Sequence, residues 1–384
     1  MSGERHGRGV YHPVRRLTRV RHRRECYLRD VRLSTPCHYS AVSPYSRLLL
    51  LSRTYRPAWW LPGPHSATLW GRVGRREPRH PVRMERWDTP DGDFVELARV
   101  AAPTPDAPRL LLFHGLEGGV HSHYARAMFR EARTRGWGAD LLLFRSCGSE
   151  PNRLPRSYHS GETTDPRFVI ERLAREFPDA PIGLMGVSLG ANVLCKLLGE
   201  DGEGVTANVK GAVAMSTPFD LARASRHIGR GFGVVYERFF LKSLIPKALS
   251  KVDRHNELAP LRSVRRARTL WEFDDQFTAP LHGFRDAADY YARASSLPFL
   301  ATIRRPTLLL SAVDDPFLPA DVLDQVRTVA EDNQALTIEF HDRGGHVGFT
   351  SGSLPWNHGT MVSGGVLSFS PRCFDHADVV RMFC

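Results

Sequence analysis

The chain has 384 residues, of which 42% are hydrophobic, so it can bury one large core in a single domain. Its longest leucine run, Leu48 to Leu51, falls far short of the roughly 20 apolar residues that a membrane-spanning helix needs. The net charge of +12 is unevenly distributed: residues 1–55 hold twelve Arg and three acidic residues, so the other 329 residues carry only +3. Because the body of the chain is nearly neutral, we expect no nucleic-acid partner.

The Arg-rich N-terminal segment could touch anionic lipid or RNA, but a solvated, disordered extension explains it more simply. It has no apolar stretch followed by a cleavage site, so we find no secretory signal and expect a cytoplasmic protein. The six cysteines are scattered and include no C-x-x-C pair, which favours reduced thiols over a disulfide framework.

From about residue 82 onward, short apolar runs alternate with helical patterns. This order predicts an α/β fold, in which helices cover both faces of a mostly parallel sheet. The runs with two apolar faces predict buried strands at 110–113, 141–144, 182–185, 211–215 and 307–310, and a later strand is expected at 336–340. Helices are expected at 123–135 and 164–177.

One interval is too long for a simple connection. About 90 residues separate the strand ending near Met215 from the strand beginning at Thr307, where a crossover needs only about a dozen. We therefore predict an inserted helical cap at about 217–300. Its many aromatic residues could line an acyl pocket or simply pack the cap onto the core, and the sequence leaves both uses open.

A candidate nucleophile lies between a predicted strand and a predicted helix. The segment Gly186-Val-Ser188-Leu-Gly190 matches G-x-S-x-G, directly after strand 182–185 and before the helical stretch 191–198. In this context the serine occupies a sharp turn whose flanking glycines avoid collisions with neighbouring backbone. The pattern predicts that Ser188 is exposed above the strand ends as a nucleophile.

A serine hydroxyl needs a base and an orienting acid, which in this fold follow it in the order Ser, Asp, His. Two adjacent acids, Asp314 and Asp315, follow the strand that begins at Thr307, and His346 follows two glycines after the next strand. We prefer Asp315, because its spacing to Pro319 fits the D-x-x-x-P form of this loop, and keep Asp314 as the alternative. His346 is the predicted base.

Acyl transfer also needs backbone N–H groups that bind the developing oxyanion. We expect these from Leu189, at the start of the helix after the nucleophile, and from Leu116, in the segment His114-Gly-Leu-Glu-Gly118 after strand 110–113. His114 itself is expected to serve as a hydrogen-bonding residue.

Two other features could carry chemistry. His121 and His123 could suggest a metal, but no ordered carboxylate or cysteine partners accompany them, so no metal and no cofactor is expected. Nothing near Cys147 predicts a lowered thiol pKa, so packing is its expected role.

At these residues the sequence resembles the YheT-like group of α/β-hydrolases, also called the AB hydrolase 4 family. The resemblance runs from about Pro57 to Ser351 and rests on the segments Trp59–Thr68, Phe113–Gly118, Ser122–Tyr124, Glu150–Arg153, Tyr158–Glu162, Gly186–Asn192, Phe273–Pro280 and Gly344–Phe349. It implies a hydrolase that acts on carboxylic esters, including acyl lipids in some relatives, with the triad Ser188, Asp315 and His346.

The expected organisation is a basic extension at 1–55, a catalytic domain at 56–350 and an atypical tail at 351–384. We expect an esterase or lipase-like enzyme whose partner is a small acyl ester, with peripheral membrane contact left open. Acyl transfer and thioester hydrolysis use the same residues and remain alternatives, as does a non-catalytic scaffold.

Overall fold

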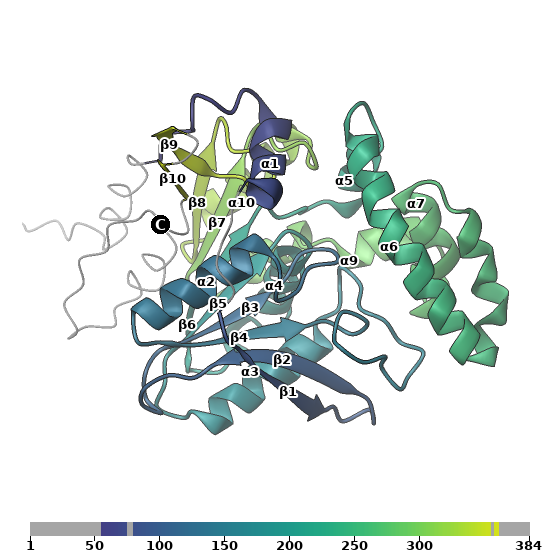
Figure 1. Cartoon of the computed structure of the whole chain (residues 1–384), viewed down its shortest axis with the longest axis horizontal. Coiled ribbons are helices and arrows are strands. Elements are labelled where there is room, and N and C mark those ends of the chain that lie inside the picture. Colours follow the sequence, from purple (N-terminus) through teal and green to yellow (C-terminus); the bar gives the residue numbers. More distant parts are fainter. Residues whose placement is uncertain (1–54, 75–79, 355–356, 361–384) are drawn as a thin grey trace, which may run out of the picture. The chain divides into compact units, whose positions relative to one another are not determined.

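The computed structural model describes residues 55–74, 80–354 and 357–360 (Figure 1). The predicted basic extension therefore lies outside the described residues except for Tyr55, and so does the predicted tail from residue 361 onward.

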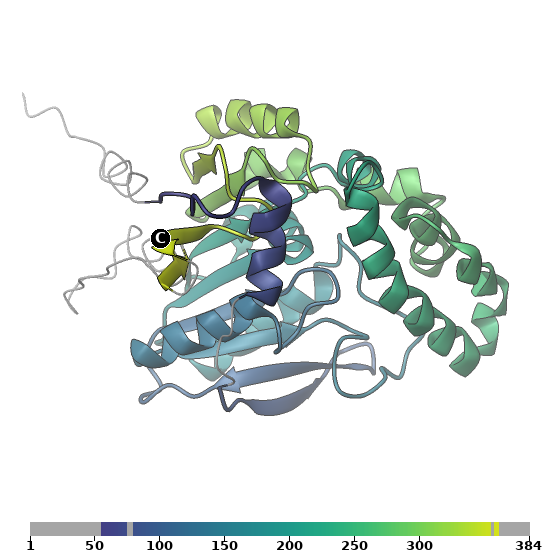
Figure 2. The same cartoon turned by 45° about the horizontal axis from the view of Figure 1, so that its top comes forward.

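A large sheet forms the centre of the described part of the chain (Figures 1 and 2). In the described residues it has eight strands, in the order β1-β2-β4-β3-β5-β6-β7-β8. The pairs β1–β2 and β2–β4 are antiparallel, and every other neighbouring pair is parallel. The strands are β1 (Arg83–Asp88), β2 (Phe94–Val100), β3 (Arg109–Phe113), β4 (Gly138–Leu143), β5 (Ile182–Val187), β6 (Val209–Met215), β7 (Thr307–Ala312) and β8 (Leu336–His341).

Within this sheet, β1 and β2 are the strands that the sequence patterns did not predict. All of β2 is buried, but Glu96 and Arg99 interrupt its apolar run. Arg99 is accommodated because its Nε donates to Asp140 Oδ1 on β4 at 2.6 Å. A charged residue that is paired in this way can be buried, although it breaks the apolar pattern by which a core strand is predicted.

Helices pack on both faces of the sheet. One face contacts α3 (Thr164–Glu176), α4 (Leu189–Asp201) and α10 (Ala320–Asp332) in a cluster that includes Leu111 and Leu184. The other face contacts α2 (His123–Thr134) and includes Leu110 and Leu112. Adjacent residues of β3 thus enter opposite layers, as the alternation of side chains along a strand requires. The mostly parallel, doubly covered sheet confirms the predicted fold class.

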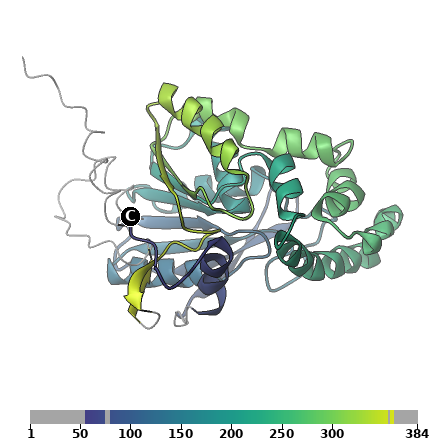
Figure 3. The same ribbon diagram turned by 90° about the horizontal axis from the view of Figure 1, so that it is seen from above.

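The interval between β6 and β7 is helical and lies to one side of the sheet (Figures 1 and 3). It contains α5 (Leu221–Ile228), α6 (Gly233–Arg254), α7 (Leu270–Phe273), α8 (Ala279–Leu281), α9 (Ala287–Ala294), a π-helical turn at Asp274–Thr278, and 3₁₀ segments at Asn256–Arg266 and Leu297–Thr302. Leu241, Leu244 and Val252 of α6 pack with Phe273 and Phe277 in a cluster of their own. This cluster holds α6, α7 and the π-helical turn together.

The remaining described elements are short. Helix α1 (Pro64–Val73) precedes the sheet, a 3₁₀ turn (Gly202–Gly204) follows α4, and β9 (Thr350–Leu354) pairs antiparallel with β10 (Asn357–Thr360). The chain at Ala58 returns to this region, because its N–H donates to the Thr350 carbonyl oxygen at 2.9 Å. The two ends of the described part are thereby tied together.

Candidate active site

Ser188 occupies the single residue between β5 and α4, with φ 54° and ψ −119°. This positive-φ conformation is strained for a residue with a side chain, at a cost of about 1–3 kcal/mol. The turn is tight on both sides. A Cβ at position 186 would lie 2.5 Å from Ala191 Cα, and a Cβ at position 190 would lie 2.3 Å from the Phe113 carbonyl oxygen. Only glycine fits Gly186 and Gly190, so the local sequence presents the serine hydroxyl at the strand end.

His346 meets this hydroxyl from the loop after β8. Its Nε2 lies 2.9 Å from Ser188 Oγ. The backbone N–H of His346 donates to Thr68 Oγ1 at 2.9 Å, and the Phe317 ring stacks on the imidazole with 4.0 Å between centroids. The next N–H, that of Val347, donates to Ser216 Oγ at 3.0 Å. These contacts hold the imidazole in one orientation.

The two adjacent acids have different partners. Asp315 is buried, and its Oδ2 lies 2.9 Å from His346 Nδ1. Asp314 instead accepts the N–H groups of Gly344 and Gly345, both at 2.8 Å on Oδ1. Asp315 therefore faces the imidazole, whereas Asp314 supports the glycine turn that carries it.

The spacing of these three side chains allows one continuous line of hydrogen bonds. When the Asp315 carboxylate accepts from His346 Nδ1, Nε2 is left as an acceptor. The Ser188 hydroxyl can then donate to Nε2. This arrangement allows the imidazole to take a proton from the serine when the serine attacks an electrophile.

Two backbone N–H groups in the Ser188 region have no acceptor within the described residues. The Gly115 N–H donates to Tyr124 Oη at 3.0 Å and the Glu117 N–H to Tyr158 Oη at 3.1 Å, whereas the Leu116 N–H between them has no acceptor within the described residues. Leu189 begins α4, so its N–H has no intrahelical acceptor. Leu116, Leu189 and Ser188 line the same cavity.

The loop that carries Leu116 is tied to the helical insertion. Glu117, at φ 56°, accepts from Tyr158 Oη at 3.0 Å and pairs with Lys247 Nζ of α6 at 2.8 Å. Sequence patterns missed Tyr158 and Lys247 as neighbours of the site. Tyr158 and Thr68 both lie in segments that carry the family resemblance. That resemblance could have indicated that they belong near the site.

Neither His114 nor Cys147 is placed for catalysis. His114 is fully buried, its Nδ1 donates to the Gly115 carbonyl oxygen at 2.7 Å, and its Nε2 accepts the Phe144 N–H at 3.2 Å. Burial lowers the His114 pKa to about 4, so the ring is neutral. Burial also raises the pKa of the Cys147 thiol to about 12, which leaves it protonated at neutral pH. Within the described residues, no three His, Cys, Asp or Glu side chains are grouped to hold a metal ion.

The cavity beside Ser188 is apolar for much of its wall and polar in one region. Its apolar lining comes mainly from the insertion, with Leu221, Ile228, Phe240, Leu244, Phe273 and Phe277. Its polar lining includes Asp274, whose Oδ2 accepts from Tyr291 Oη at 2.6 Å. Desolvation by the surrounding protein raises the Asp274 pKa to about 6. The cavity therefore suits a ligand with an apolar chain.

Comparison with known proteins identifies the family of this chain. The profile described as "alpha/beta hydrolase fold" matches residues 108–349. The Escherichia coli (strain K12) protein YheT, named as a candidate esterase, is 41% identical over 76% of this chain and 85% of its own length. The monoacylglycerol lipase of Saccharomyces cerevisiae is 30% identical over 63% of this chain and 55% of its own, and human phospholipase ABHD3 is 26% identical over 80% and 76%. The profile match and the similarity to YheT show that this chain belongs to the YheT-like group of the α/β-hydrolase family.

Proposed function

We propose that this α/β-hydrolase cleaves carboxylic esters through an acyl-enzyme formed on Ser188. The observation that carries the proposal is the hydrogen-bonded line from Asp315 through His346 to Ser188, which ends at a largely apolar cavity. An ordinary strand-to-helix turn would need neither the strained serine nor the histidine that meets it from another loop.

In the proposed reaction, Ser188 Oγ attacks the ester carbonyl carbon while His346 Nε2 accepts the hydroxyl proton. Asp315 holds the imidazole and stabilises its charged form. The C–O bond to the alcohol breaks, and the imidazolium gives its proton to the leaving alkoxide. Water, deprotonated by His346, then attacks the acyl-serine, which releases the carboxylic acid and restores the hydroxyl.

The oxyanion that forms in each step would accept hydrogen bonds from the N–H groups of Leu116 and Leu189. Their availability and their place beside Ser188 in the cavity support these roles. A preorganised donor at such a position accounts for about 100-fold or more in rate in comparable enzymes. The Glu117–Lys247 pair would hold the Leu116 loop against the insertion.

We propose further that residues 56–350 form the catalytic domain and that the helices between β6 and β7 act as its cap, with their apolar side chains binding the acyl chain. The names of two relatives, a monoacylglycerol lipase and a phospholipase, favour acyl lipids as the substrate class.

The test is labelling of the protein by a fluorophosphonate probe, followed by turnover of nitrophenyl esters from acetate to decanoate. We expect Ser188-dependent labelling and specificity that rises with chain length. Labelling without net hydrolysis, accompanied by ester formation when an alcohol is added, would instead indicate acyl transfer.

A further inference from the structure

Exposed apolar side chains gather on two neighbouring helices. Leu69 and Val73 of α1 are 39% and 76% exposed, and Phe232, Val235 and Phe239 at the start of α6 are 46%, 53% and 46% exposed. Only two other large hydrophobic residues among those described are as exposed, Trp59 just before α1 and Met84 on β1. Neighbouring exposed apolar residues mark an interaction surface, whereas single exposed apolar residues are normal and need no explanation.

The two helices form one surface because their side chains touch. The Arg72 guanidinium lies 4.2 Å from the centroid of the Phe239 ring, and the His65 and Phe232 rings are 4.6 Å apart. His65 Nδ1 also lies 3.3 Å from Tyr236 Oη. Figures 1 and 2 show α1 beside this end of the insertion. We call the five residues Leu69, Val73, Phe232, Val235 and Phe239 the apolar face.

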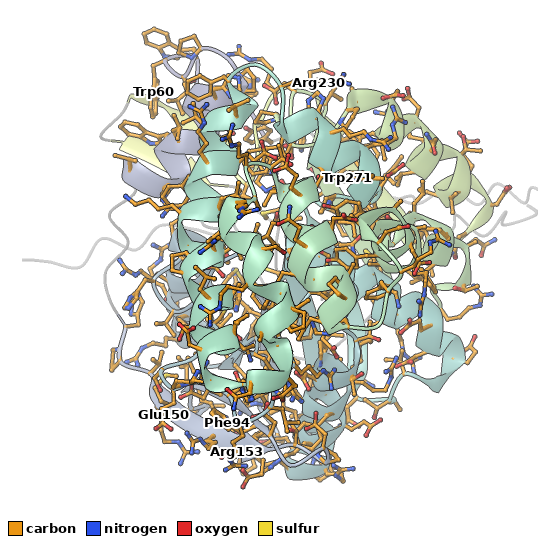
Figure 4. The ribbon with its side chains drawn as sticks, turned by 90° about the vertical axis from the view of Figure 1, so that its right-hand side faces the viewer. Trp60, Phe94, Glu150, Arg153, Arg230 and Trp271 are labelled. Carbon is orange, nitrogen blue, oxygen red and sulfur yellow. The ribbon has the colours of Figure 1, made fainter. Side chains whose placement is uncertain are left out.

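Basic residues surround the apolar face. Arg72, Arg230, Arg238 and Lys242 are exposed, and no ion pair joins any of them to an acidic side chain in the described part of the chain. Arg238 and Lys242 alternate with Val235 and Phe239 on the outer side of α6, where positions three and four residues apart are neighbours. In Figure 4, Arg230 and Trp60 lie at one end of the view and Glu150 at the other.

The inner side of the same helix belongs to the candidate active site. Phe240, Leu244 and Lys247 of α6 line the cavity beside Ser188. Successive ring contacts also connect the apolar face to the triad. The distances between ring centroids are 5.7 Å from Phe232 to Tyr236, 4.9 Å from Tyr236 to Phe317 and 4.0 Å from Phe317 to His346. One helix, about 10 Å across, thus separates the outer surface from the cavity.

We propose that the apolar face and its basic rim dock on the surface of an anionic lipid bilayer. Aromatic and aliphatic side chains would enter the interface between headgroups and acyl chains, while the arginines and the lysine pair with lipid phosphates. Docking would place the cavity one helix away from a supply of acyl chains. Among the described residues, none of the helices could span a bilayer.

The charges favour a bilayer over the chain's own N-terminal segment as the occupant. Residues 1–55 carry a balance of +9 and would be repelled by a rim of four cations. An anionic surface satisfies both the rim and the apolar face at once. Docking is independent of the proposed ester hydrolysis, because vesicle binding is measured without turnover.

The experiment measures flotation of the full chain with vesicles of phosphatidylcholine containing about a third phosphatidylglycerol, and with phosphatidylcholine alone. Val235→Asp combined with Phe239→Asp should weaken binding at least tenfold, because two acidic groups replace the apolar contact. Arg238→Glu with Lys242→Glu should remove the preference for anionic vesicles. The matched control is Met84→Asp, an exposed apolar residue on β1 that should bind as the unaltered chain does.

Turnover of a soluble short-chain ester, or a thermal unfolding curve if no ester is cleaved, shows that each variant is folded. Binding by the Val235→Asp, Phe239→Asp variant equal to that of the unaltered chain would overturn the proposal and assign vesicle binding to the N-terminal arginines. Failure of the unaltered chain to bind anionic vesicles, or displacement from them by RNA with the same dependence on these residues, would also overturn it.

Discussion

Replacement of Asp315 by Asn tests the roles of the two adjacent acids most sharply. Asp315 Oδ1 accepts the Phe317 N–H at 2.8 Å, so the amide oxygen of an asparagine would keep that position. Its NH₂ group would then take the place of Oδ2, 2.9 Å from His346 Nδ1. NH₂ can only donate, and it would lie closer to Nδ1 than the retained oxygen, which is 3.1 Å away, so the ring favours the tautomer in which Nδ1 accepts and Nε2 carries the proton. Nε2 can then no longer accept the proton of Ser188.

The expected loss follows from this wrong tautomer. A comparable change lowers turnover about 10⁴-fold in serine proteases, which corresponds to about 5.5 kcal/mol of activation free energy. Asp314→Asn is the matched control. Its amide oxygen can still accept both glycine N–H groups, so this variant loses only the difference between a charged and a neutral acceptor. That difference is about 0.5–1.5 kcal/mol, and kcat should therefore fall by roughly tenfold at most.

The assay is kcat on nitrophenyl butyrate, with thermal unfolding of both variants to show that they are folded. A loss for Asp315→Asn of less than tenfold, or a greater loss for Asp314→Asn, would refute the assignment of Asp315 as the orienting acid.

Three further predictions use other parts of the structure. Specificity for nitrophenyl esters should rise about fourfold per methylene, or about 0.8 kcal/mol, from acetate to medium chains. Leu244→Trp should make this rise level off at a shorter chain. A monotonic fall from acetate would refute the acyl-pocket proposal. The Asp274 pKa is raised from 3.8 to about 6, so the folded state favours the protonated acid. The free energy of unfolding, measured by urea titration, should therefore fall as pH rises from about 4 to 6. Asp274→Asn should flatten this slope. Deletion of residues 1–50 should leave kcat on a soluble ester within about threefold, a change under roughly 0.7 kcal/mol, and loss of folded protein would show that this segment packs on the rest.

Much of the fold could be predicted because the central strands β3 to β7 are apolar on both faces. The strand β2 could not, because Glu96 and Arg99 are buried through ion pairs and hydrogen bonds that come from distant residues. The strand β1 could not, because it is polar and only Trp87 in it is buried. Contacts between residues far apart in the sequence leave no local pattern from which to predict them.

The candidate site shows the same limit. Ser188 and His346 stand out from local glycine patterns, so both could be named in advance. Lys247 lies on an ordinary helix, and its contact with Glu117 depends on how the insertion packs against a loop 130 residues earlier. No local pattern encodes that contact.

Fluorophosphonate labelling and ester turnover of Ser188→Ala, beside the unaltered chain, test the nucleophile directly. We expect labelling to disappear and kcat to fall by at least about 10³-fold, because loss of the triad nucleophile costs a rate of this order. The thermal unfolding midpoint should stay nearly unchanged, since the removed hydroxyl faces a cavity. His346→Ala should show a comparable loss in turnover. Full labelling or full turnover by Ser188→Ala would show that Ser188 is not the nucleophile.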